Sequence, residues 1–222
     1  MLLAYIFGLN QKKLIRTNNL SVKYGDIDIE FPNINLDYGG QLLIIGKSGT
    51  GKTSLLNILG GLLSPENGNV LVNDVDLFTL SNNKRDNYRG QQIGFVFQTP
   101  HFIKSLSVND NLKFSQYMSS KVNQPKIDML LKNVDLLNLK NSKIQDLSEG
   151  EKQRISIIRA LVNQPSIIFA DEPTSALDDD SSYKVVDLLT NLSQKNNTTL
   201  VIVTHDKRIK DKFSNQINLN DF

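Results

Sequence analysis

Residues 46–53 have the residue types and the spacing of a loop that binds phosphate. The segment reads Gly46-Lys47-Ser48-Gly49-Thr50-Gly51-Lys52-Thr53, and Ser54 follows it. Glycines let the backbone fold around an anion with its N–H groups pointing inward, which larger side chains would block. Lys52 would then reach the β- and γ-phosphates of a nucleotide, and the Thr53 hydroxyl would hold Mg²⁺. The alternative is a glycine-rich turn that binds nothing.

Polar side chains with catalytic potential follow three further apolar runs. Residues 93–97 lead to Gln98, residues 167–170 to Asp171 and Glu172, and residues 199–203 to His205. Because the carboxyl ends of parallel strands meet at one edge of a sheet, we expect these groups beside the phosphate loop. Asp171 fits a second Mg²⁺ ligand, and Glu172 could orient or deprotonate the attacking water. His205 could bond the γ-phosphate or that water, or could simply cap its strand.

The segment before the loop reads as β structure, and the segment after it as a buried helix. A strand over 14–24 ends at the turn Gly25-Asp26, and the alternation over 27–31 predicts a half-buried antiparallel strand. Tyr24, at the end of the first strand, could stack on a purine or pack against the sheet rim. Apolar residues from Leu55 to Leu63 predict a helix that Ser64-Pro65 stops.

Further along the chain, short motifs mark a hairpin and a helical region. Asn73-Asp74 between two apolar runs predicts a β-hairpin. Strand signals stop after Thr99, and helical patterning follows in 107–118, where Ser107 and Asp110 suggest a capping box, and in 126–139. A further helix begins after its predicted N-cap, Ser148. We therefore expect an α/β fold with a mostly helical insertion.

Composition describes an ordinary globular chain and excludes several kinds of site. The chain has 222 residues, 39% hydrophobic and 22% charged, with a formal net charge of +2. So small a charge gives no electrostatic case for binding nucleic acid. The absence of cysteine excludes disulfides and cysteine-ligated metal sites. No apolar run is long enough to cross a bilayer, and residues 1–9 suggest an extra strand, a frayed tail, an early start codon or a weak membrane-surface anchor.

With these motifs in order, the chain resembles the ATP-binding cassette (ABC) family from Tyr24 to His205. The residues that carry the resemblance are Tyr24, the loop 46–53, Gln98, the signature Leu147-Ser148-Glu149-Gly150-Glu151-Lys152-Gln153-Arg154, Asp171-Glu172, Asp178 and His205. The resemblance implies a P-loop NTPase (RecA-like) core, an N-terminal antiparallel β subdomain and an inserted α-helical subdomain. It also implies ATP and Mg²⁺ as cofactors, and no other metal.

In this family two copies face each other, and each signature covers the ATP held by the other copy's phosphate loop. The resemblance therefore implies that Ser148 and Gly150 act across a homodimer. It makes Tyr24 an adenine-stacking residue and Asp178 a residue of communication between copies. Gln98 would contact Mg²⁺ and connect the site to the helical insertion, whose outer surface docks on membrane partners.

Two features depart from the family pattern: the segment before Leu14, and Glu149 and Glu151, which replace Gly and Gln in the signature. A negative charge pointing at the γ-phosphate would oppose binding, so we expect the Glu149 side chain to turn outward. Residues 93–98 and 105–112 look like those of the subfamily that serves lipoprotein release and macrolide-type export.

We therefore interpret residues 1–222 as one ABC ATPase domain. Residues 1–98 and 157–222 would form the β subdomain and the α/β core, and 99–156 the helical subdomain with the signature. Its function would be to power export through separate membrane permease subunits from the cytoplasmic face of the cell membrane. The alternatives are a cell-division type ATPase that moves a membrane protein without transport, a DNA-acting ABC ATPase and a regulatory module without turnover.

Overall fold

The computed structural model describes residues 13–118, 121–175 and 179–222. The interpretations of residues 1–9 and of Asp178 therefore lie outside the described residues. Within the described ranges, no helix is both long enough and apolar enough to cross a membrane.

An antiparallel sheet forms the N-terminal part of the fold. Its strands are β1 (Lys13–Tyr24), β2 (Ile27–Glu30), β3 (Asn35–Asp37), β5 (Asn67–Val72) and β6 (Val75–Asp76). The order is β2-β1-β5-β6, and β3 also pairs with β1. The predicted hairpin is confirmed, since Asn73 and Asp74 both have positive φ (50° and 63°), as a tight turn between twisted strands requires. The half-buried character predicted for residues 27–31 is confirmed at two of its three apolar positions, since Phe31 is 6% exposed and Ile29 packs against the core. It is wrong at Ile27, which lies at the turn that joins β1 and β2 and is 65% exposed.

A parallel sheet carries the polar strand ends. Its strands, in order across the sheet, are β10 (Gln216–Asn218), β4 (Gln41–Ile45), β9 (Thr199–Thr204), β8 (Ile167–Asp171) and β7 (Ile93–Val96). Ile45 pairs with Thr204, and Asp171 pairs with Val203. This register brings the end of β4 level with the ends of β8 and β9, as the sequence predicted.

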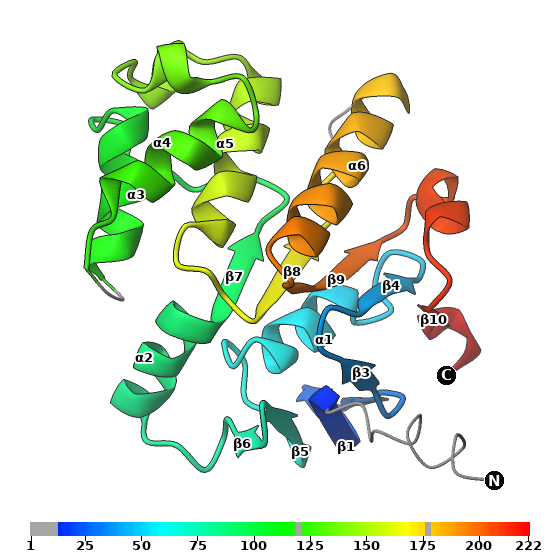
Figure 1. Cartoon of the computed structure of the whole chain (residues 1–222). Coiled ribbons are helices and arrows are strands. Elements are labelled where there is room, and N and C mark those ends of the chain that lie inside the picture. Colours follow the sequence, from blue (N-terminus) through cyan, green and yellow to red (C-terminus); the bar gives the residue numbers. More distant parts are fainter. Residues whose placement is uncertain (1–12, 119–120, 176–178) are drawn as a thin grey trace, which may run out of the picture.

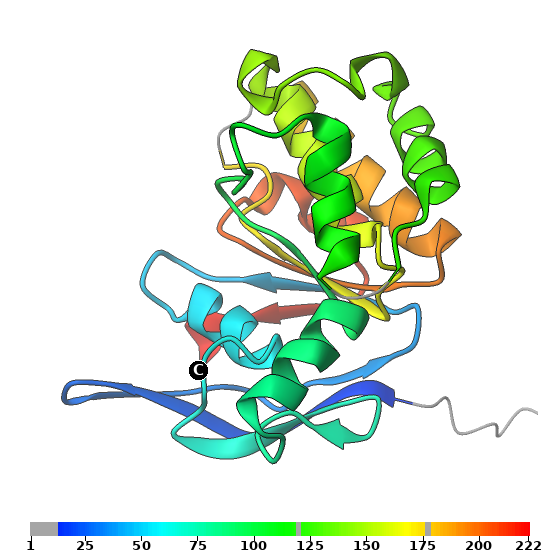
Figure 2. The same cartoon turned by 90° about the vertical axis from the view of Figure 1, so that its left-hand side faces the viewer.

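Helices cover both faces of the parallel sheet (Figures 1 and 2). They are α1 (Lys52–Leu59), α2 (Asn82–Gln92), α3 (Val108–Tyr117), α4 (Gln124–Lys132), α5 (Glu149–Leu161) and α6 (Asp179–Lys195). One hydrophobic core joins α1 to the antiparallel sheet and to one face of the parallel sheet, with Ile44, Phe169 and Val203 pointing into it. A second core joins the opposite face to α3, α4, α5 and α6. The alternating side chains of the buried strands therefore fix both layers.

Helix boundaries differ from the predictions at two places. The helix expected to reach Leu63 ends at Leu59, because Gly61 has φ of +68° and the N–H groups of Gly61 and Leu62 turn back to donate to the carbonyls of Ile58 and Asn57. The single helix expected over 126–139 is instead α4 and a separate 3₁₀ turn at Leu137–Leu139, divided at Asp135, where φ is +58°. Helix α2 was not predicted; none of its residues is buried, so it carries no apolar stripe.

Candidate active site

The phosphate loop joins β4 to α1 and is shaped by its glycines. Gly49 and Gly51 have φ of +85° and +84°, a region that side chains disfavour. A Cβ added at Gly46 would approach the Thr50 hydroxyl to 2.4 Å. The loop therefore turns tightly onto the N-terminus of α1, where anions bind favourably.

The Lys52 ammonium lies inside this loop. It donates to the carbonyl oxygens of Gly46 and Lys47, both at 2.9 Å, and lies 3.7 Å from Glu172 Oε1. The residue is only 7% exposed. A buried cation at the centre of a ring of backbone groups is suited to a phosphate ligand.

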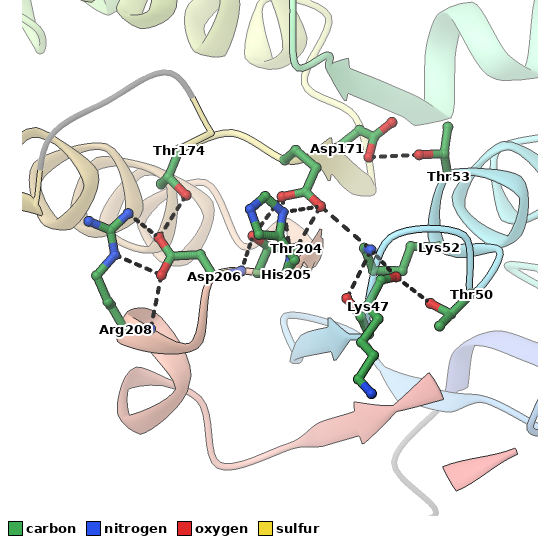
Figure 3. A network of polar contacts seen from close by, with 12 residues as sticks. Lys47, Thr50, Lys52, Thr53, Asp171, Thr174, Thr204, His205, Asp206 and Arg208 are labelled. Atoms are coloured by element: carbon green, nitrogen blue, oxygen red, sulfur yellow. Dashed lines mark hydrogen bonds and ion pairs between the residues drawn. The ribbon is translucent and has the colours of Figure 1, made fainter. Parts of the chain in front are cut away.

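Thr53 and Asp171 meet at the carboxyl edge of the parallel sheet (Figure 3). The Thr53 hydroxyl donates to Asp171 Oδ1 at 3.3 Å. Burial raises the pKa of the Asp171 carboxyl, and the neighbouring Glu172 raises it further, while the bond from Thr53 acts in the opposite direction. The hydroxyl and carboxylate oxygens together form a donor set that suits Mg²⁺, which prefers oxygen ligands and binds through one or two carboxylates plus substrate phosphates.

Glu172 is held by four hydrogen-bonding contacts from β9 and the residue after it. Its carboxylate accepts from the Thr204 hydroxyl at 2.8 Å and from the His205 N–H at 3.1 and 3.3 Å. The ring atom His205 Nδ1 lies 2.9 Å from Glu172 Oε1. The Glu172 side chain is 11% exposed and that of His205 is 63% exposed, so a fixed, buried carboxylate stands behind an accessible imidazole.

Lys52, Thr53, Glu172 and His205 line one cavity of about 730 Å³, and Asp171 is not among its lining residues. It brings together most of the predicted site residues. Those that line it are Tyr24, Gly46, Lys47, Ser48, Gly49, Gly51, Lys52, Thr53, Ser54, Gln98, Glu172 and His205. Tyr24 is 49% exposed, and its hydroxyl lies 2.9 Å from Ser54 Oγ. Its stacking on a purine stays a prediction.

The signature lies apart from this cavity, at the N-terminus of α5. Ser148 is the N-cap, as predicted, and forms a full capping box with Glu151. Hydrogen bonds from the Ser148 hydroxyl and N–H lower the pKa of the Glu151 carboxyl. The Glu149 side chain is 78% exposed and pairs with Lys152 at 2.8 Å. Its orientation away from a γ-phosphate held by a second copy stays a prediction. Gly150 leaves open space beside the helix, since an added Cβ there would meet nothing within 4 Å.

Sequence reasoning missed several residues that hold the site in place. Asp206 is buried, accepts from the Arg208 side chain at 2.8 and 2.7 Å, and accepts from the Thr174 hydroxyl at 3.3 Å (Figure 3). It joins the segment after His205 to the segment after Glu172. The polar run from Thr204 to Asp206 was visible as a signal, but the partner positions depend on the fold.

Comparisons with known proteins agree with this architecture. The model of the family described as "ABC transporter" matches residues 30–175. The lipoprotein-releasing system ATP-binding protein LolD 1 of Rhodopirellula baltica is 38% identical over 85% of this chain and 84% of its own. The putative hemin import ATP-binding protein HrtA of Staphylococcus aureus is 36% identical over 96% and 91%.

A solved structure, the dimeric post-hydrolysis state of the ATP-binding cassette MJ0796 bound to ADP and Pi, superimposes with a TM-score of 0.80. It is 32% identical, covering 92% of this chain and 93% of its own. The chain belongs to the ABC transporter family. It is an ATP-binding cassette that hydrolyses ATP as the ATPase subunit of a transporter.

Proposed function

We propose that each copy of this chain supplies the chemical half of a site that hydrolyses ATP. Lys52 and the backbone of residues 46–54 bind the phosphates, and Tyr24 stacks on adenine. Thr53, Asp171 and Gln98 hold Mg²⁺, which supplies charge neutralisation to the phosphate oxygens. The polar oxygens that Thr53 and Asp171 bring within 3.3 Å support this assignment, as does Gln98 on the same cavity wall.

Glu172 would orient or deprotonate the attacking water, and His205 would bond the γ-phosphate or that water. The observation that carries this proposal is the fixed carboxylate of Glu172, bonded to Thr204 and His205 and 3.7 Å from the Lys52 ammonium. A carboxylate held this way can accept a proton from water without losing its position, because its neighbours restrain both oxygens.

The test is ATP turnover by wild type and by Glu172→Gln. The amide keeps the shape of the side chain but cannot act as a base, so kcat should fall about 10²-fold or more. The dissociation constant for ATP should stay within about twofold, because the phosphate loop is untouched. Equal kcat values for wild type and Glu172→Gln would show that Glu172 is not a catalytic residue.

The second half of each site would come from another copy of the chain. Ser148, Gly150 and the N-terminus of α5 would cover the ATP held by the opposite phosphate loop, and Asp178 would communicate between copies. Two observations support this. Among the described residues, none of 148–150 lines the 730 Å³ cavity, so they cannot cover ATP bound in their own copy. Ser148 is also exposed, so it is accessible to a second copy. Exposed helix N-termini attract phosphate oxygens.

We also propose that residues 99–156 dock on separate membrane permease subunits, so that the protein works at the cytoplasmic face of the membrane. A cavity of about 540 Å³ is lined jointly by this part of the chain and by the α/β core, and its lining includes the aromatic side chains of Phe97, Phe102 and Phe114. The name of the lipoprotein-releasing relative supports export, whereas the name of the putative hemin import relative supports uptake. We propose export on the basis of the lipoprotein-releasing relative together with residues 93–98 and 105–112, which look like those of the export subfamily. Copurification from membranes would test this: a permease supports transport, whereas an envelope protein without a substrate path supports the mechanical alternative.

A further inference from the structure

The phosphate loop is anchored from residues near the C-terminus. The N–H of Lys47 donates to the side-chain oxygen Oδ1 of Asn220 at 2.9 Å, across 173 positions of sequence. The Lys47 carbonyl accepts from the Lys52 ammonium at 2.9 Å and from the Thr50 hydroxyl at 3.0 Å (Figure 3). Both backbone polar groups of Lys47 are therefore hydrogen-bonded. Its carbonyl is bonded by residues of the loop itself, and its N–H is bonded by Asn220, outside the loop.

Asn220 is itself oriented for this contact. Its side-chain nitrogen donates to Asn218 Oδ1 at 2.6 Å, so its oxygen is left to face Lys47. Asn218 ends β10 and pairs with Ile45, the residue just before the loop. Leu219 is buried, and its Cβ lies 3.3 Å from the position of a Cβ added at Gly46. Residues 218–220 thus lie beside the start of the phosphate loop, and Leu219 packs next to Gly46, the first glycine of the loop.

Asn220 also lines the 730 Å³ cavity with Lys52, Glu172 and His205. We propose that Asn220 is a positioning residue for ATP binding, which fixes the entry of the phosphate loop in its phosphate-binding conformation. A loop that is ordered before the ligand arrives binds more tightly, because the entropy of ordering is not lost in the binding step. This inference rests on the proposed role of residues 46–53 in holding the phosphates.

The test uses Asn220→Ala, with Gln216→Ala as its matched control. Gln216 begins β10, just before the 3₁₀ turn Leu219–Asp221 that contains Asn220. Its side chain donates to the carbonyls of Lys210 at 2.9 Å and Phe213 at 2.5 Å, so its variant loses hydrogen bonds of the same segment away from the loop. Asn220→Ala should raise the Kd and KM for ATP about three- to tenfold, the worth of one hydrogen bond, and leave kcat at saturating ATP within about twofold. The Lys47 amide should also exchange its hydrogen faster. Gln216→Ala should change none of these quantities.

Two results would overturn the inference: an unchanged Kd in Asn220→Ala, or an equal rise in Kd in both variants, which would indicate a general loosening of the C-terminal strand. Lys52→Ala, measured in the same assay, separates this outcome from a failure of the proposed function. If Lys52→Ala binds ATP like wild type, the loop itself is not the phosphate site. If Lys52→Ala loses binding while Asn220→Ala keeps it, the role of Asn220 alone is wrong.

Discussion

Glu172 has a left-handed backbone conformation, with φ of +46°, which is costly for a side chain of its size. Its N–H donates to the Val203 carbonyl at 2.9 Å, and its carboxylate is bonded by Thr204 and His205. These contacts from β9 restrain the residue in that conformation. The sequence pointed to Glu172 because it follows a buried strand. Nothing in the local sequence indicates its positive φ, which depends on contacts with Thr204 and His205, 32 and 33 positions later in the chain.

Glu151 should give the N-terminus of α5 a stability that depends on pH. Its bonds to Ser148 hold the pKa of Glu151 below its ordinary value of 4.5. A pKa lowered by folding stabilises the protein fully above the unfolded-state value, and that contribution is lost as pH falls through the folded-state value. Wild type should therefore melt at a higher temperature than Glu151→Ala at about pH 7, and the difference should shrink as pH is lowered toward about 3. A difference that stays constant over this range would contradict the capping role.

At the scale of elements, the outcome of each prediction depended on whether the fold buries the segment. The strands β4, β7, β8 and β9 are continuous apolar runs with polar ends, so both their existence and their place in the site were predicted. Helix α2 has no buried residue, so it was not predicted. The apolar residues up to Leu63 suggested a longer α1, but the helix ends earlier at a cap formed by Gly61, where φ is +68°. Hydrophobic periodicity indicates burial, and it carries no information where a helix is not buried or where a glycine cap ends the helix inside an apolar run.

Gly150 offers a test of function that is separate from folding. An added Cβ would meet nothing within 4 Å in its own copy, and alanine favours a helix over glycine by up to about 1 kcal/mol. Gly150→Ala should therefore unfold at the same or a higher temperature than wild type. Its ATPase activity should fall about tenfold or more. The added methyl group would keep the N-terminus of α5 away from the γ-phosphate of the ATP that the second copy holds.

Gly94→Ala serves as a matched control, which should show that the melting temperature responds when a glycine with no room for a methyl group is replaced. A Cβ at Gly94 would lie 2.3 Å from the Ala160 carbonyl, between β7 and α5. Gly94→Ala should therefore lower the melting temperature, since backbone must move to admit the methyl group. If Gly150→Ala keeps full activity, close packing of a second copy at Gly150 is contradicted.

The whole molecule presents the two halves of the proposed site on different parts of one chain. The 730 Å³ cavity contains the phosphate loop with Glu172 and His205, whereas Ser148 and Gly150 begin α5 elsewhere. The order of motifs in the sequence identified both halves, and the resemblance to a family indicated how two copies would join them. Asn220 and Asp206 were not identified, because their roles consist of contacts that only the folded chain creates.

The central claim is that ATP joins two copies through the loop of one and the signature of the other. The most direct measurement is the molecular mass of Glu172→Gln in solution with and without ATP, alone and combined with Ser148→Arg. Slow hydrolysis should let Glu172→Gln accumulate as a dimer when ATP is present and remain a monomer without it. The added arginine should abolish the dimer while ATP binding to the monomer persists. A Glu172→Gln protein that binds ATP but stays monomeric, or a dimer that Ser148→Arg leaves intact, would contradict the claim.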